Sequence, residues 1–501
     1  MNTFMNQLNN NTNYKYTENG ALTYKSLNNP VYDMFAFGAA YRQRDDADCI
    51  LLFKEAFEYD QSLALKCLFW IRDCRGGAGE RRFFRVCIKW LAENYPARIR
   101  DLLIYVPEYG RYDDWFELFD TPVENYIIEL IRDQLMNDMI SDKNGISLLA
   151  KWLPSENASS PRTIAKAKKI RKALGLTAKE YRQVLSGLRQ KINVLERLMS
   201  ANEWDKIEFD KIPSKAGLIY KNAFARRDII AKQYEAFAKS KTTTVNANTL
   251  YPYEVVKKGR RVVRLPLDNV DRLMVNKYWE NLPDYFEGKE CSMMCVVDTS
   301  GSMTWGTASI MPIDVAISLG LYCAERLNGP FKNHYISFAS EPQLIKTIGV
   351  DFVDKVERIY RTNLCDSTNL EAVFDLLLKT ARQPGVKKED IPKTIVVISD
   401  MEIDEGTQHW HRGQINQWTK ETFATEMETI RTEWQAYGFE LPKLVYWNVN
   451  ARHNTILDMG PNVSFVSGAS PTIFKQVITG KTGWELCLET LTGTDRYNVI
   501  K

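Results

Sequence analysis

The chain is poor in histidine and lacks the cysteine patterns that bind zinc or form disulfides. Only four of its 501 residues are histidines, and none of its nine cysteines are spaced as Cys-x-x-Cys. Several of these cysteines lie inside apolar runs, which is typical of buried thiols. These counts argue against a zinc site, a histidine-based catalytic triad and a disulfide framework, and they favour free thiols in a reducing cytosol.

Long hydrophobic runs are also missing. No stretch reaches the roughly 18 apolar residues of a transmembrane helix. The N-terminal stretch MNTFMNQLNNNTNYKY is polar and lacks the apolar core of a signal peptide, so export is not expected. Hydrophobic residues make up 45% and charged residues 26%, as in globular proteins, and the length suggests roughly two to four domains. A cytoplasmic protein without a membrane partner is therefore expected.

One segment is strongly basic although the chain is nearly neutral overall. The formal net charge is +3, yet residues 162–197 hold eleven lysines and arginines against two glutamates. A local basic stripe typically binds phosphate polymers, and the alternative is a solvated helix face. The candidate RNA-binding residues are Arg162, Lys166, Lys168, Lys169, Arg171, Lys172, Arg182 and Arg189.

Up to about residue 250 the hydrophobic pattern is helical. The buried-type residues Phe84, Cys87, Ile88 and Leu91 recur at the spacing of one helix face. Residues 45–60 and 61–74 predict two helices joined by a minimal turn. A succession of such helices with short turns predicts antiparallel helix pairs, as in an α-solenoid.

After about residue 285 the pattern changes to short β-rich runs separated by helices. The expected strands are 292–298, 334–340, 393–400, 443–450 and 463–470, and the expected helices are 315–327, 369–382 and 420–438. This alternation predicts a mostly parallel, doubly wound sheet, in which ligands bind beyond the carboxyl ends of the strands. Residues 240–285 are expected to connect the halves, with a β-hairpin across Lys258-Gly259.

The stretch VDTSGSM (297–303) follows the first expected strand and allows three interpretations. A nucleophilic serine needs small residues on both sides, but Asp298 stands two residues before Ser300. A phosphoryl-transfer aspartate usually has a second aspartate two residues on, where this chain has Ser300. Both alternatives therefore rank below a cation site.

A cation site accounts for more of the residues around this stretch. Asp298, Ser300 and Ser302 can direct a carboxylate and two hydroxyls at one point. Thr368 opens a later helix and Asp400 ends a later strand, so both also lie above the sheet. Hard oxygen ligands suit Mg²⁺ or another divalent cation, and an open position could accept a carboxylate from a partner protein.

This arrangement resembles the metal-ion-dependent adhesion site of von Willebrand factor A (vWA) domains. The resemblance covers roughly residues 289–480 and rests on DTSGS followed by Thr368 and Asp400. It implies that Asp298, Ser300, Ser302 and Thr368 contact the metal. It also implies that Asp400 binds the metal directly or through water.

The helical half carries a second resemblance. Stretches such as RDCRGGAGERRFFR (72–85), EYGRYDDWFELF (108–119) and PSKAGLIYKNAF (213–224) look like a family of uncharacterised proteins with a helical region followed by a vWA domain, of the domain of unknown function 2828 type. The order is similar to the TROVE module of Ro ribonucleoprotein autoantigens. That similarity implies a HEAT-like solenoid, ring-shaped in Ro, that binds structured RNA outside and single-stranded ends in its hole.

Two short motifs have plain structural interpretations. CRGGAGERR (74–82) lacks the ending of a P-loop, so a glycine-rich turn between helices is favoured over a phosphate cradle. The arginines in this motif could still face RNA. Asp113 and Asp114 in GRYDDW are best explained by capping of a helix N-terminus rather than by a catalytic carboxylate pair.

The expected architecture is α plus α/β. It comprises a polar segment (1–29), a helical TROVE/HEAT-like domain (30–285) and a vWA domain with a C-terminal tail (286–501). The expected function is binding of structured or single-stranded RNA without catalysis, with Mg²⁺ at the vWA site for a protein partner. A protein-interaction scaffold that binds no RNA is the alternative, and a metal-dependent phosphoesterase using Asp298 ranks last.

Overall fold

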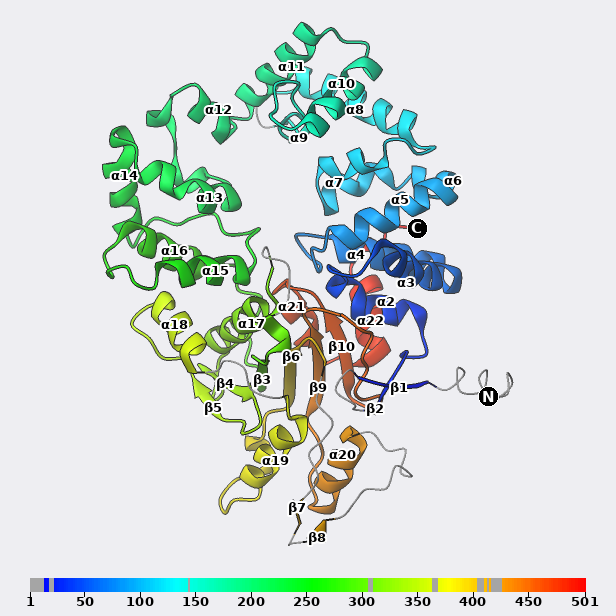
Figure 1. Ribbon diagram of the computed structural model, residues 1–501, viewed down its shortest axis with the longest axis vertical. Helices are drawn as coiled ribbons and strands as arrows, with labels where there is room; N and C mark the ends of the chain where they lie inside the picture. The colour runs from blue at the N-terminus through cyan, green and yellow to red at the C-terminus, as the bar shows by residue number, and fades with distance from the viewer. Residues whose placement is uncertain are drawn as a thin grey trace.

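The computed structural model of the protein contains two halves of different architecture, one helical and one built on a sheet (Figure 1). It describes residues 13–17, 22–142, 145–304, 310–362, 368–402, 410–411, 414–415 and 426–501. The α plus α/β class expected from the sequence is confirmed.

The first half consists of α-helices and short 3-10 helices (η). They are α2 (Pro30–Phe37), η1 (Gly38–Ala40), α3 (Asp46–Tyr59), α4 (Gln61–Arg72), α5 (Arg82–Asn94), α6 (Pro96–Arg100), η2 (Leu103–Tyr105), α7 (Val106–Tyr109), η3 (Tyr112–Leu118), α8 (Glu124–Ile140), α9 (Leu149–Trp152), α10 (Pro161–Ala173), α11 (Ala178–Lys191), α12 (Leu195–Ser200), η4 (Trp204–Lys206), η5 (Phe209–Lys211), α13 (Ser214–Ala225), α14 (Asp228–Lys239), α15 (Pro252–Val262) and α16 (Val270–Glu280). A two-stranded hairpin of β1 (Tyr14–Tyr16) and β2 (Leu22–Tyr24) precedes them.

The expected helical pair at residues 45–74 is confirmed. Asp60 alone separates α3 from α4, and its side chain accepts a hydrogen bond from the Leu63 N–H at 2.9 Å. One residue can therefore end a helix and cap the next, because its extended backbone breaks the first helix and its carboxylate satisfies a free amide of the second.

The helices of the first half form a closed ring with the sheet (Figure 1). They rise from α2 beside the sheet to α8–α11 at the far side, and return through α12–α16 to the opposite side of the sheet. A solenoid of stacked helix pairs curves when each pair is rotated slightly against its neighbour. Here the succession of helices curves so that both of its ends meet the second half of the chain (Figure 1).

The second half alternates strands and helices. Its elements are β3 (Met293–Asp298), η6 (Ser302–Thr304), α17 (Pro312–Arg326), β4 (His334–Phe338), β5 (Leu344–Lys346), α18 (Phe352–Thr362), α19 (Leu370–Ala381), η7 (Lys388–Asp390), β6 (Thr394–Ser399), β7 (Trp410–His411), β8 (Gln414–Ile415), α20 (Glu426–Ala436), β9 (Lys443–Asn448), β10 (Val463–Ser467), α21 (Ile473–Val477), α22 (Gly483–Thr492) and η8 (Asp495–Tyr497). All five expected strands are present. Of the helix expected at 420–438, residues 420–425 lie outside the described residues.

The main sheet has six strands in the order β10-β9-β6-β3-β4-β5, and only β5 is antiparallel to its neighbour. The first strand, β3, lies between β4 and β6, so the winding direction reverses there. Every residue of β3 is buried. Gly320 of α17 allows the helix to approach closely, because a Cβ there would lie 2.3 Å from Cγ2 of Val297.

The expectation of a hairpin across Lys258-Gly259 is wrong, because these residues lie inside helix α15. Pro252, Val255, Val256, Gly259 and Val262 are buried at helical spacing, and Pro252 begins the helix. Two short apolar pairs on either side of a glycine resemble a hairpin locally. The longer period identifies one face of a helix.

Helices α15 and α16 join the ring to the second half. The Arg272 guanidinium makes two hydrogen bonds to Asp351, of 2.7 and 2.8 Å, just before α18. The rings of Trp279 and Phe352 stack with centroids 4.2 Å apart. Residues 240–285 are therefore part of a packed seam and not only a connection.

The described cysteines are free thiols, as expected. Eight of the nine fall in the described residues, six of them are buried, and none forms a disulfide. Across the described ranges, no helix combines the length and the apolar character needed to cross a bilayer.

Candidate functional site

The first candidate site lies at the carboxyl ends of two neighbouring strands. Asp298 ends β3, and Asp400 directly follows β6. These strands are adjacent and parallel, and the strand order reverses at β3. Loops at such a switch point diverge and leave a crevice, which is where ligands bind in doubly wound sheets.

Asp298 is fully buried and joins the two strands. Its Oδ1 accepts the Ser300 N–H at 2.8 Å, and its Oδ2 accepts the hydroxyl of Ser399 at 2.5 Å. Ser399 is the last residue of β6 and also accepts the Met401 N–H at 2.9 Å. The carboxylate is therefore held in a defined orientation by groups from both loops.

The expected ligand residues converge on this point by different contacts. The hydroxyls of Ser300 and Ser302 lie 3.0 Å apart, and Ser302 donates to Oδ1 of Asp400 at 3.3 Å. Thr368 is buried and its hydroxyl donates to the carbonyl of Glu402 at 3.3 Å, two residues beyond Asp400. The structure thus brings four of the five residues together and places Thr368 against the same loop.

The electrostatics of this cluster favour a cation. Burial, followed by the proximity of Asp298, raises the pKa of Asp400 to about 7. Two buried carboxylates that repel one another are stabilised by added positive charge. The donor set of two carboxylates and three hydroxyls, all hard oxygens, fits Mg²⁺ or a similar divalent ion.

Arg452 also contacts the candidate site, which the sequence did not reveal. Its guanidinium Nη2 lies 3.4 Å from Oδ2 of Asp400. It follows β9 in the loop that contacts the ring, where the Ala451 N–H donates to the carbonyl of Ala40 at 3.2 Å. The only signal for Arg452 in the sequence was its position in the loop after a third parallel strand. Loops after parallel strands lie at the same edge of the sheet, so this position places Arg452 near the site.

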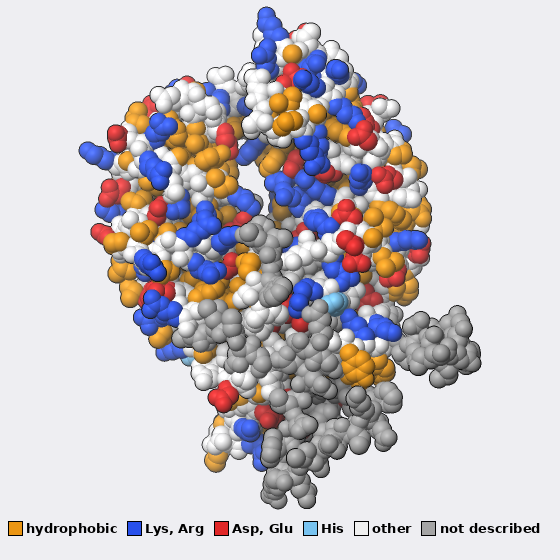
Figure 2. All heavy atoms as spheres, in the orientation of Figure 1, with side chains coloured by type: hydrophobic (Ala, Val, Ile, Leu, Met, Phe, Trp, Pro, Cys, Tyr) orange, Lys and Arg blue, Asp and Glu red, His pale blue; other side chains and the backbone are white. Residues whose placement is uncertain are grey.

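The second candidate site is the cavity enclosed by the ring. It has a volume of about 2510 Å³ and is lined by both halves of the chain. Figure 2 shows the opening, with lysine and arginine side chains around it. The basic residues that line it are Arg42, Arg72, Arg75, Arg81, Arg82, Arg111, Lys151, Lys179, Arg182, Arg189, Arg197, Lys215, Lys257 and Lys258.

The acidic residues of this cavity are fewer, and each has a partner. Five glutamates line it, and among the described lining residues there is no aspartate. The pairs are Glu80 with Arg42, Glu108 with Arg496, Glu156 with Arg171, Glu254 with Lys215, and Glu196 with the Tyr220 hydroxyl. Arg72, Arg82, Arg111 and Arg197 also pair with carboxylates behind the wall, and the remaining lining cations leave the cavity with an excess of positive charge.

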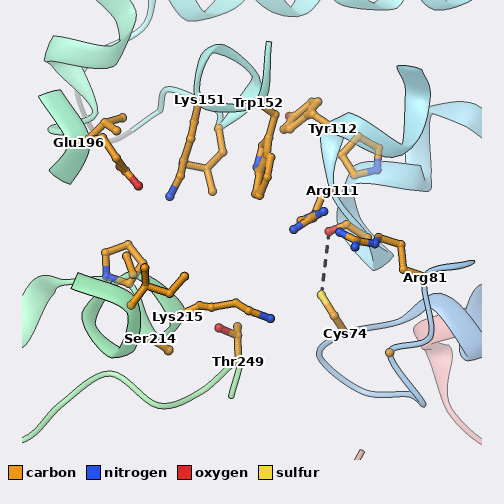
Figure 3. A pocket seen from close by; sticks show the side chains of 18 of the residues that line it. Cys74, Arg81, Arg111, Tyr112, Lys151, Trp152, Glu196, Ser214, Lys215 and Thr249 are labelled. Carbon is orange, nitrogen blue, oxygen red and sulfur yellow. Dashed lines mark hydrogen bonds between the residues drawn. The ribbon is translucent and has the colours of Figure 1, made fainter. Parts of the chain in front are cut away.

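Several of these cations lack a carboxylate partner. Within the described residues, Arg81 makes no ion pair and no side-chain hydrogen bond, and it points into the cavity (Figure 3). Burial and the neighbouring guanidiniums of Arg111 and Arg85 lower the pKa of Arg81. Burial and the neighbouring Arg261, Lys221 and Lys257 likewise lower the pKa of Lys258. Crowded cations of this kind attract a polyanion.

The basic stripe predicted from the sequence does not form one open face. Arg182 and Arg189 of α11 line the cavity, whereas the six residues from Arg162 to Lys172 on α10 do not. Lys166 pairs with Glu117 at 3.2 Å and Lys169 pairs with Glu124 at 2.9 Å. Arg162, Lys168 and Lys172 are exposed. RNA binding by these residues stays a prediction.

The CRGGAGERR segment forms the expected turn. The N–H groups of Ala78 and Glu80 donate to the carbonyls of Trp70 and Ile71 at the end of α4, at 3.1 and 2.7 Å. Gly79 adopts a φ of 69°, which glycine tolerates best. These amides cap α4, so they are not directed at an external phosphate.

The Asp113-Asp114 pair does more than cap a helix. Oδ2 of Asp114 accepts the Arg111 N–H at 3.0 Å, as expected of a cap. The same fully buried carboxylate also accepts the Nε groups of Arg72 at 2.8 Å and Arg85 at 2.6 Å. It therefore links α4, α5 and η3, a structural role that the local sequence could not reveal.

Comparisons with known proteins agree with a two-part chain. The family model described as Domain of unknown function (DUF2828) matches residues 17–103 and 157–287. This match confirms the resemblance to that family that the sequence predicted for the helical half. Domain of unknown function (DUF7788) matches residues 292–490. The Uncharacterized protein L728 of Acanthamoeba polyphaga mimivirus is 28% identical, covering 94% of this chain and 85% of that protein. The crystal structure of the Deinococcus radiodurans RO (RSR) protein covers 93% of this chain and 100% of that one, at 14% identity and a TM-score of 0.35.

Proposed function

We propose that the protein binds RNA in the cavity of its ring and catalyses no reaction there. The observation that carries the proposal is the excess of cations on the cavity wall, where fourteen lysines and arginines and five glutamates line the cavity. Six of these cations form ion pairs, whereas others, such as Arg81, Arg182 and Lys258, form none among the described residues. Such a wall binds the phosphates of a strand that enters the ring, since phosphate contacts dominate the affinity of proteins for nucleic acids.

The exposed cations on α10 extend this proposal to the outer surface. Arg162, Lys168 and Lys172 lie on the outside of the ring, where they can contact structured RNA that is too wide to enter. The two surfaces are close in sequence, because Arg182 and Arg189 on the next helix face the cavity. A folded RNA with a single-stranded end could use both.

The test is equilibrium binding of single-stranded and structured RNA over a range of salt concentrations. We expect affinity at low salt that falls steeply as salt rises, because binding releases counterions from the phosphates. Failure of both RNAs to bind at low salt would contradict the proposal.

A second function is supported by the cluster around Asp298. We propose that the second half is a vWA domain whose cation site holds Mg²⁺ and accepts a carboxylate from a protein partner. Asp298, Ser300, Ser302, Thr368 and Asp400 would hold the ion, which supplies an open coordination position for that carboxylate. Ser399 and the Ser300 amide orient the Asp298 carboxylate by hydrogen bonds.

The scaffold and phosphoesterase alternatives differ from these proposals in measurable ways. A scaffold that binds no RNA would capture an acidic partner in Mg²⁺ and lose it in Asp298→Ala, with no affinity for RNA throughout. A phosphoesterase would turn over a generic phosphoester with Mg²⁺ and lose that activity in Asp298→Asn. We expect RNA binding that survives Asp298→Ala, and no turnover.

A further inference from the structure

We infer that Trp152 and Arg111 form a stacking site for an unpaired nucleobase inside the ring cavity. This inference rests on the proposed RNA-binding function and specifies what the cavity recognises besides charge. The guanidinium carbon of Arg111 lies 4.1 Å from the centroid of the Trp152 ring, and both residues line the cavity. In Figure 3 the Trp152 side chain projects into the cavity with Arg111 beside it.

Arg111 is held so that its plane is fixed. Its Nε and Nη2 donate to the two carboxylate oxygens of Asp113 at 2.9 and 2.8 Å. Arg85 contacts the same carboxylate at 2.9 Å, so Asp113 is itself anchored. With one edge held by this bidentate pair and one face packed on the indole, the guanidinium still has its second face and the N–H groups of Nη1. Its side chain is 30% exposed, on the wall of the cavity that it lines.

Trp152 is placed by the short helix that it ends. The flanking residues Leu149 and Leu153 are buried, which anchors the backbone on both sides of the ring. The indole itself is half-buried. Trp152 thus presents part of its ring to the cavity, next to lysine and arginine side chains. A flat aromatic ligand would cover it.

Cations surround the pair at positions suited to a strand's phosphates. Arg81 and Lys151 extend toward the same space (Figure 3). Lys215, whose ammonium group also pairs with Glu254, approaches it from a third element. A planar stack flanked by point cations matches the alternation of base and phosphate in a single strand. Polyphosphate, a sulfated sugar or an acidic peptide would use the cations but not the stack. A duplex would hide the faces of its bases.

The pair therefore selects a single strand whose bases are unstacked. Stacking on Arg or Trp is tolerant of sequence, since every base has a π face. We expect purines to bind better than pyrimidines, because their rings cover more of the Trp152-Arg111 surface.

The experiment compares three polyanions on the full-length protein at one salt concentration. The probes are a short oligoadenylate, an abasic ribose-phosphate strand of equal length, and inorganic polyphosphate. The variants are Trp152→Leu, Trp152→Phe and Arg111→Lys. The control is Arg100→Lys, because Arg100 and Tyr126 form a similar pair, 4.5 Å apart, that does not line the cavity.

We expect the native protein and the control variant to bind oligoadenylate more tightly than the abasic strand. Trp152→Leu and Arg111→Lys should each lose on the order of tenfold in affinity for oligoadenylate and none for polyphosphate. Trp152→Phe should retain most of the preference, and the salt slope should stay unchanged in Trp152→Leu. Thermal unfolding identifies any variant that is not folded. If Trp152→Leu is not folded, the affinities of Trp152→Phe are compared with those of the native protein instead.

Other results would overturn the inference in distinguishable ways. Equal affinity of the native protein for oligoadenylate and the abasic strand would show a charge-only cavity and leave the proposed function intact. Unchanged oligoadenylate affinity in folded Trp152→Leu would show that the pair is structural. Failure of all three polyanions to bind at low salt would remove the proposed function and this inference together.

Discussion

The guanidinium of Arg496, close to the C-terminus, forms a two-point ion pair with the buried carboxylate of Asp73, directly after α4. The Tyr497 hydroxyl donates to the same carboxylate at 2.9 Å. This contact spans 423 residues and fastens the end of the second half onto the first helices of the ring (Figure 1). With the Arg272–Asp351 pair on the opposite side, it closes the ring.

Loss of the Arg496–Asp73 pair should destabilise the closed ring. We expect Arg496→Ala to lower the free energy of unfolding by roughly 1–3 kcal/mol, because it leaves Asp73 buried with less compensation while Arg496 itself is partly solvated. Chemical denaturation measures this. Lys379→Ala, which breaks an exposed pair with Asp375, is the control and should cost below about 0.5 kcal/mol. Equal effects of the two variants would contradict the assigned role.

Asp114 should be among the most sensitive positions of the helical half. Asp114→Asn leaves the buried guanidinium of Arg72 without its full countercharge, which typically costs about 3–5 kcal/mol. Asp113→Asn is the matched control, since its side chain is 21% exposed and a smaller loss is expected. Denaturant titration of both variants distinguishes a capping role, which costs about 1 kcal/mol, from the network described here.

Each cavity cation that contacts phosphate should contribute to the salt dependence of RNA binding. Arg81→Gln and Arg182→Gln should each reduce the slope of log affinity against log salt by about 0.7 for a single strand. Lys168→Gln and Lys172→Gln on α10 should leave that slope unchanged for a single strand but reduce it for structured RNA. The reverse pattern would place the strand on the outer surface.

The proposed cation site predicts opposite effects at two neighbouring residues. Asp298→Asn should abolish Mg²⁺ binding measured by calorimetry. Arg452→Ala should increase Mg²⁺ affinity several-fold, because the guanidinium lies 3.4 Å from Asp400 and competes for its charge. Weaker Mg²⁺ binding in a folded Arg452→Ala would show that this arginine supports the site instead.

Asp33 should make stability depend on pH in the acid range. Burial raises the pKa of Asp33 to about 6, although hydrogen bonds from the Leu27 N–H and the Ser26 hydroxyl lower it in part. The folded state therefore holds an extra proton between about pH 4 and 6. The contribution of this proton to the stability of the folded state is full below about pH 4, and it is lost as the pH rises through 6. Asp33→Asn should flatten this part of the profile in thermal melts, and an unchanged profile would contradict it.

Much of the fold could be predicted because its signals are local. The five expected strands were placed within three residues, since each is a short apolar run between turn residues, whereas the short edge strand β5 was not expected. The hairpin prediction at Lys258-Gly259 failed because a window of a few residues does not distinguish period 2 from period 3.6. Only the full stretch from Pro252 to Val262 does.

The candidate cation site was partly predictable for the same reason. Asp298 and Asp400 end strands that the sequence identifies, and parallel strands bring their carboxyl ends together. Ser399 and Arg452 were missed, because nothing in their own neighbourhoods indicates which carboxylate they will meet.

The sequence by itself determined the order of the elements, the polar loops above the sheet and the surplus of basic residues, because periodicity, capping and composition are properties of short segments. The tertiary structure decided which cations are neutralised and which face a ligand. Lys169 meets Glu124 across 45 residues, while Arg81 points into the cavity without a carboxylate partner among the described residues. Ion pairing depends on contacts between distant segments, so only the closed ring brings cations from several segments, including part of the basic stripe, around one cavity.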